Sequence, residues 1–131
     1  MVKLYTDGGA RGNPGPAAGA AILYDMHGAL ISKGSEYYGT GTNNQAEYKA
    51  LILGLTLALE QNITAISAFL DSELVVKQLT GLYKVKDSSL AILFSRVKAL
   101  ENKFEVVSYT HIPRSQNKEA DLLVNKELDN N

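Results

Sequence analysis

The sequence predicts an α/β domain with a mixed sheet and helices on both faces. Three apolar runs separated by turn residues come first, and segments with helical spacing then alternate with further apolar runs. The length of 131 residues and the hydrophobic content of 45% are those of one globule with a single core. We therefore expect a single domain over residues 1–131, with a polar tail at residues 129–131.

Five segments have the apolar pattern that is typical of strands. The second and third are joined through Met26, His27 and Gly28, which predicts a hairpin. The first is followed by a stretch rich in glycine and proline, which we expect to form a loop. The expected strands are residues 2–7, 17–25, 29–38, 64–71 and 104–110.

Four segments are expected to form helices. Thr42 is followed three residues later by Gln45, which is the pattern of a capping box, so a helix is predicted from there to about Gln61. The next helix should end at Gly81, a residue type that often follows a helix. The remaining expected helices are residues 72–80, 88–101 and 117–128.

Composition limits the classes of site. The chain has no cysteine, so a metal site must use Asp, Glu, His or carbonyl ligands, which favour hard cations. No signal-peptide pattern or membrane-length apolar run is present, so we expect a soluble, cytoplasmic monomer without a membrane partner. The net charge is −1, yet six of the 13 Lys and Arg residues lie in residues 77–103, here called the basic segment. Its side chains either lie on solvated helix faces or contact phosphates.

Four acidic residues stand where burial is expected. Asp7 and Asp71 each follow an apolar run, and Glu47 and Asp121 each interrupt an otherwise apolar helix face. Each could cap a helix or pair with Lys or Arg. As a group they favour another interpretation, because a buried carboxylate is costly unless it is paired or binds a cation.

Two strand ends and two helix faces can meet at one edge of an α/β sheet, where sites commonly form. Carboxylates gathered there repel one another and are held together by metal ions, and Mg²⁺ prefers oxygen ligands. A pair of such ions activates water and stabilises the leaving oxygen in phosphodiester cleavage. The pattern thus indicates a metal-dependent phosphoryl-transfer site whose nucleophile is water.

The sequence resembles the ribonuclease H family, type 1, from Lys3 to about Lys126. Four motifs support the likeness in order along the chain: "YTDGGARGNPGPAAGAAI", "GTNNQAEYKAL", "FLDSELVVKQL" and "HIPRSQNKEADLLVN". The resemblance implies a five-stranded mixed sheet in the order 3-2-1-4-5. It also implies cleavage of the RNA strand of RNA–DNA hybrids with two Mg²⁺ ions, or Mn²⁺ as the alternative, leaving a 5′-phosphate. The family's metal ligands fall on Asp7, Glu47, Asp71 and Asp121.

The resemblance also implies contacts to the hybrid. The main chain around Gly9, Ala10 and Gly12 and the side chains of Asn13 and Asn44 match positions that contact RNA. Thr42 matches a phosphate-binding position, for which helix capping is the alternative role. The other candidate substrate contacts are Arg11, Glu73 and Arg114, and Arg11 could equally be an exposed bystander.

His111 has the spacing to Asp121 of the family's catalytic histidine, although a structural role at a strand end is the alternative. Some members of the family have an inserted basic helix and loop, the basic handle, for which the segment of residues 81–89 is too short. We also expect no separate hybrid-binding domain. We therefore expect a short form that binds substrate weakly. The alternative functions are a catalytically silent nucleic-acid-binding module and a metal-dependent nuclease that acts on double-stranded RNA.

Overall fold

The computed structural model describes all 131 residues and contains one five-stranded sheet in the order β3-β2-β1-β4-β5. Strand β1 is antiparallel to β2 and parallel to β4, so the sheet is mixed, as predicted. The strands are β1 (Val2–Ala10), β2 (Gly15–Tyr24), β3 (Leu30–Gly41), β4 (Ala65–Leu70) and β5 (Val106–His111). The helices are α1 (Asn43–Glu60), α2 (Glu73–Leu79), α3 (Ser88–Glu101) and α4 (Lys118–Asp129), with a short 3₁₀ turn, η1 (Arg114–Gln116).

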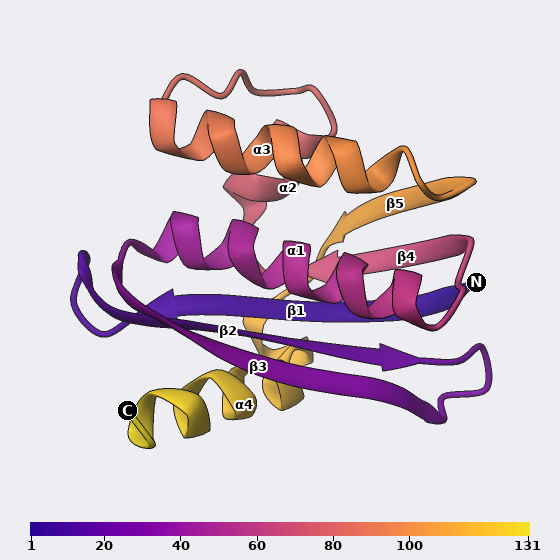
Figure 1. Cartoon of the computed structure of the whole chain (residues 1–131), viewed down its shortest axis with the longest axis horizontal. Helices are drawn as coiled ribbons and strands as arrows, with labels where there is room; N and C mark the ends of the chain where they lie inside the picture. Colours follow the sequence, from indigo (N-terminus) through magenta and orange to yellow (C-terminus); the bar gives the residue numbers. More distant parts are fainter.

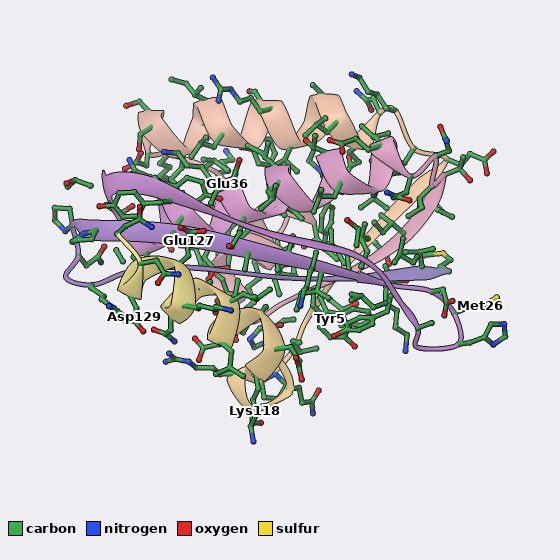
Figure 2. All side chains as sticks on the ribbon, turned by 60° about the horizontal axis from the view of Figure 1, so that its bottom comes forward. Tyr5, Met26, Glu36, Lys118, Glu127 and Asp129 are labelled. Carbon is green, nitrogen blue, oxygen red and sulfur yellow. The ribbon has the colours of Figure 1, made fainter.

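Helices cover both faces of the sheet. Helices α1, α2 and α3 lie on one face, and α4 crosses the other beneath β2 and β3 (Figure 1). The main core lies between the sheet and the first group of helices and includes Leu4, Leu51 and Ile66, all fully buried. Figure 2, viewed from the α4 side, shows this helix running from Lys118 to Asp129 across the strands. No helix of the structure combines the length and apolar character needed to cross a membrane.

The glycine-rich segment after β1 differs from expectation. The predicted strand ends at Asp7, but β1 continues to Ala10 and β2 begins at Gly15, so only residues 11–14 form the connection. The prediction that Asp7 ends the strand was therefore wrong. The small residues instead form a paired hairpin, in which Gly8 lies opposite Gly19. Their lack of side-chain bulk leaves room for the first turns of α1.

The start of α1 is fixed by its cap and by a close approach to β1. The Thr42 hydroxyl accepts from the Gln45 main chain and the Gln45 side chain accepts from the Thr42 main chain, which confirms the capping box. Gly8 packs against the main chain of Ala46 so closely that any side chain there would overlap it. The contact between these two backbones determines where Glu47 lies relative to Asp7.

Residues 80–87 connect α2 to α3 without another helix, as expected for a chain that lacks the basic handle. Leu82 and Tyr83 are exposed in this connection, together with Lys84 and Lys86. The basic segment therefore includes an accessible loop as well as the helices on either side of it.

We predict that Gly8→Ala lowers the free energy of unfolding by about 2–4 kcal/mol, because its methyl group would push the main chains of β1 and α1 apart. Gly9→Ala is the matched control. Its methyl group would lie 3.8 Å from Asn43 Oδ1, an ordinary contact, so its effect should stay within about 1 kcal/mol. Urea unfolding of both variants measures the difference, and equal stabilities would contradict the packing described here.

Candidate active site

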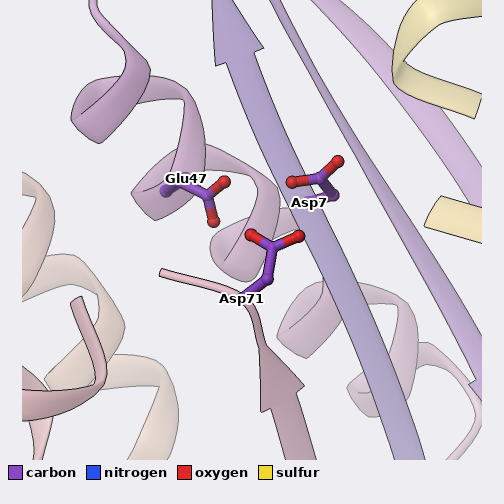
Figure 3. A group of neighbouring side chains, drawn as sticks. All are labelled: Asp7, Glu47 and Asp71. Carbon is purple, nitrogen blue, oxygen red and sulfur yellow. The ribbon is translucent and has the colours of Figure 1, made fainter. Parts of the chain in front are cut away.

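Three carboxylates meet at one edge of the sheet. Asp7 comes from β1, Glu47 from the second turn of α1, and Asp71 from the residue that follows β4 (Figure 3). Each offers an oxygen within 4.8 Å of those of the other two. Asp7 and Glu47 are 6% and 5% exposed, and Asp71 is half-buried. The structure thus brings together three of the four acids that the sequence analysis proposed as metal ligands.

The sheet register explains why Asp7 and Asp71 are neighbours. The parallel pairing of β1 with β4 ends at Thr6 and Leu70. The residue that follows this last pair is an aspartate in each segment, Asp7 in one and Asp71 in the other. The main-chain N–H of Gly8 lies 3.0 Å from both Asp7 Oδ1 and Glu47 Oε1 and donates to both. This one amide links the β1 acid to the α1 acid.

Two of the three carboxyl groups, those of Asp7 and Glu47, have raised pKa values. Burial, and secondly the negative charge of Asp71, raises the pKa of Asp7 to about 7. Burial, and then the charge of Asp7, also raises the pKa of Glu47 well above its ordinary value. Asp7 and Glu47 therefore bind protons more readily than ordinary carboxylates do, and a nearby cation would oppose this effect.

No Lys or Arg of the chain forms an ion pair with Asp7, Glu47 or Asp71. The alternative that each of these acids is neutralised by a basic side chain is therefore wrong. Glu47 Oε2 is buried and has no hydrogen-bond partner. An all-oxygen donor set with one unpartnered oxygen fits a hard divalent cation such as Mg²⁺ or Mn²⁺.

Asp121 lies beside this group but outside it. The Asp121 carboxylate is close enough to Asp7 to contribute to its raised pKa, although burial and Asp71 contribute more. Its Oδ1 lies 3.6 Å from Nη2 of Arg114, and its side chain is 31% exposed. Asp121 is thus placed at the rim of the three-carboxylate cluster, where its role as a fourth ligand stays a prediction.

The carboxylates open into a hollow of about 330 Å³. Five of the predicted substrate-binding residues line it: Gly9, Ala10, Arg11, Asn44 and Arg114. The other predicted contacts, Gly12, Asn13, Thr42 and Glu73, lie outside the lining, as does His111. A second hollow, of about 380 Å³ and lined by Tyr5 and Tyr24, contains none of the four predicted metal ligands.

Several predicted substrate contacts already have partners within the protein. Arg11 Nη2 lies 2.7 Å from Asp129 Oδ1 at the end of α4, and the Arg11 side chain is partly exposed. Asn13 Oδ1 accepts from the main-chain N–H of Asn43, and Thr42 caps α1. Contacts of these residues with a substrate stay predictions.

His111 ends β5 beside Leu70, and its Nδ1 lies 4.0 Å from Glu73 Oε2. Glu73 also accepts from Lys77 Nζ at 2.7 Å, and this pairing, followed by the charge of His111, lowers its pKa. Lys77 in turn lies over the Tyr83 ring, 5.1 Å from its centre. Glu73 thus lies between two basic side chains, and its contact with a substrate stays a prediction.

Sequence reasoning missed three polar residues near the carboxylates. Asn43 lines the hollow and accepts from the Ala10 main chain, Ser72 caps α2, and Asn117 donates to Asp71. Asn117 is 2% exposed. In the sequence, Asn117 stands directly before the Lys118–Asp129 helix, and an asparagine at that position normally indicates only a helix cap.

In metal-free protein, we predict that stability falls as pH rises from about 4 to about 7. The raised pKa of Asp7 means that the folded state holds this proton more tightly than the unfolded state does. The fold is therefore favoured at low pH and loses about 2–4 kcal/mol across this window. Urea unfolding in EDTA at several pH values measures the slope.

The Asp7→Asn variant should reduce this slope, because one of the two carboxyl groups with a raised pKa is gone. Asp129→Asn, at a carboxylate whose side chain is 65% exposed, is the matched control and should keep the wild-type slope. Wild-type stability that is constant over this pH range would contradict the clustering of the acids.

Comparisons with known proteins agree with this geometry. Residues 5–127 match the sequence model of a family described as reverse transcriptase-like. A ribonuclease HI of Halobacterium salinarum is 43% identical over 128 residues, covering 98% of this chain and 64% of that protein. The crystal structure of RNase H1 from this archaeon has a TM-score of 0.96, with 42% identity over 99% of this chain and 98% of that one.

Two further relatives extend the comparison. A bifunctional protein of Mycobacterium tuberculosis is 39% identical over 129 residues, covering 98% of this chain but 35% of that protein. The chain therefore spans about a third of the length of its mycobacterial relatives. LC11-RNase H1 from compost, whose crystal structure contains an RNA/DNA hybrid, has a TM-score of 0.94 and 38% identity, over 99% of this chain and 98% of that one. The chain belongs to the reverse transcriptase-like family, as a type 1 ribonuclease H domain.

Proposed function

We propose that this protein is an endoribonuclease that hydrolyses the RNA strand of RNA–DNA hybrids, leaving a 5′-phosphate. The observation that supports it best is the cluster of Asp7, Glu47 and Asp71 without any basic partner. The full-length similarity to an RNase H1 that was crystallised with a hybrid supports the choice of substrate. The proposal includes a monomer in the cytoplasm, and the absence of cysteine is compatible with that reducing compartment.

The carboxylates, with Asp121 at the rim, would hold two Mg²⁺ ions, or Mn²⁺ as the alternative. When bound, these ions supply Lewis-acid activation of water and stabilise the leaving oxygen. The protein itself orients the acids, because their backbones are fixed by the β1–β4 pairing and by the approach of Gly8 to α1. Ionised Asp7 and Glu47 become favourable only when cations offset their repulsion, so metal binding and deprotonation occur together.

In this proposal the hollow receives the nucleic-acid backbone. Gly9 has no side chain and Ala10 only a methyl group at its wall, and the Asn44 amide can donate or accept a hydrogen bond at the start of α1. Asn44 is a suitable partner for a ribose 2′-hydroxyl, the group that distinguishes RNA from DNA. Arg114 is loosely paired with Asp121 but has an 80% exposed side chain, which would allow contact with a phosphate.

We further propose that His111 moves protons during the reaction. Its side chain is 40% exposed, and its only charged neighbour, Glu73, is 4.0 Å away. Such loose contacts contribute little to stability, which favours the catalytic role over the structural one. At the end of β5 it is paired with Leu70, the residue just before Asp71.

The first test compares a labelled RNA–DNA hybrid, duplex RNA and duplex DNA, each with Mg²⁺ or with EDTA. We expect cleavage of the RNA strand of the hybrid, and only with Mg²⁺. Asp71→Asn should lower kcat by at least about 100-fold, because a carboxylate of the cluster is lost.

The Asp71→Asn variant should fold as well as wild type or better in EDTA, since repulsion is removed. Cleavage of duplex RNA alone would instead indicate the nuclease for double-stranded RNA. If no substrate is cut in the presence of Mg²⁺, the enzymatic proposal fails and a silent binding module is the remaining interpretation.

For His111→Ala, we expect kcat to fall by about 10–100-fold while KM for the hybrid and the unfolding free energy change little. His27→Ala, in the exposed β2–β3 turn, is the control and should behave as wild type. A large loss of stability with unchanged kcat would favour the structural role.

A further inference from the structure

Asn117 sits in the position of a helix cap but does not act as one. It is the residue between η1 and α4, and its side chain makes no capping hydrogen bond to the helix that it precedes. Asparagine at this position normally accepts from the first turn of the helix. With 2% exposure, the side chain is buried, and its amide is directed toward the strands instead.

The Asn117 amide joins the two strands at the point where their pairing ends. Its Nδ2 donates to the main-chain oxygen of Thr6 at 2.8 Å and to Asp71 Oδ2 at 3.2 Å. Thr6 immediately precedes Asp7. The pairing of β1 with β4 stops at Thr6 and Leu70. Beyond that point, the two hydrogen bonds of the Asn117 side chain connect β1 to Asp71, the residue that follows β4.

Asn117 also fixes the start of α4. Its main-chain oxygen accepts from the N–H of Asp121 at 3.1 Å, which is the first intrahelical bond of the turn that presents the Asp121 carboxylate. One residue therefore contacts the chain beside Asp7, the Asp71 carboxylate and the backbone of Asp121.

A neutral donor suits this position. An N–H that donates to a carboxylate favours its ionised form without bringing a positive charge that would compete with a cation. With Oδ2 of Asp71 held by Asn117, its other oxygen can be directed to a ligand. Groups that orient metal ligands in this way commonly change metal affinity by about 10–100-fold when removed.

We propose that Asn117 is a positioning residue that orients Asp71 and sets its separation from Asp7, so that the carboxylates bind divalent cations. The inference rests on the proposed function for its biological meaning, but metal binding can be measured without substrate. It assigns a role in the site to a residue that contacts neither the substrate nor the reacting atoms.

Calorimetric titration of the whole protein with Mn²⁺, without nucleic acid, tests the proposal. Asn117→Ala should weaken Mn²⁺ binding by about 10–100-fold, and the Mg²⁺ concentration for half-maximal cleavage should rise similarly. KM for the hybrid at saturating Mg²⁺ should stay unchanged. Tyr48→Phe is the control: it removes another buried side-chain hydrogen bond, to Gln78 Oε1 at 2.6 Å, in which no carboxylate of the cluster takes part.

Asn117→Ser guards against a variant that fails to fold. Serine is a good helix cap, but its single hydroxyl hydrogen cannot hold both Thr6 and Asp71, so the same loss of Mn²⁺ affinity is expected. In the Asp71→Asn background, Asn117→Ala should have little additional effect on Mn²⁺ affinity, because the two residues act together.

Mn²⁺ affinity within about twofold of wild type in the Ala or Ser variant, or losses that simply add in the double variant, would overturn the inference. A wild-type protein that binds Mn²⁺ but cuts no hybrid would instead refute the proposed function and leave the positioning role intact.

Discussion

Mutual repulsion among buried carboxylates is the constraint on which the site depends. Three acids with oxygens within 4.8 Å of one another, and without a basic partner, oppose folding at neutral pH when no cation is present. The fold must therefore supply enough stability elsewhere to hold them. The 17-residue core between the sheet and the first group of helices is the main source of that stability.

The backbone places the acids, and their side chains have little freedom to separate. Asp7 lies inside β1 with pairing to β2 beyond it, so the strand cannot bend away from the cluster. Glu47 is held by the contact between Gly8 and the α1 main chain, and Asp71 by the end of β4 and the Asn117 amide. Each acid thus belongs to a different element, and the three elements are fixed to one another by backbone contacts or buried hydrogen bonds.

Sequence patterns were sufficient for the fold and for most of the cluster. Apolar periodicity with turn and cap signals predicted the five strands and the four α-helices but not η1, and the order of the strands came from the family resemblance. Acids at unexpected places in apolar segments singled out Asp7, Glu47 and Asp71. The end of β1 was mispredicted because glycine usually signals a turn, whereas here Gly8 serves a close approach of helix to strand. Partners such as Asp129 for Arg11 could not be foreseen, since they join residues that are distant along the chain.

The central claim is that the cluster is a divalent-cation site. A crystal of the protein grown with Mn²⁺ and measured for anomalous scattering tests it most directly. We expect anomalous density between the carboxylates of Asp7, Glu47 and Asp71, and its disappearance in crystals of Asp7→Asn. Well-ordered carboxylates in the wild-type crystal without anomalous density among them would contradict it.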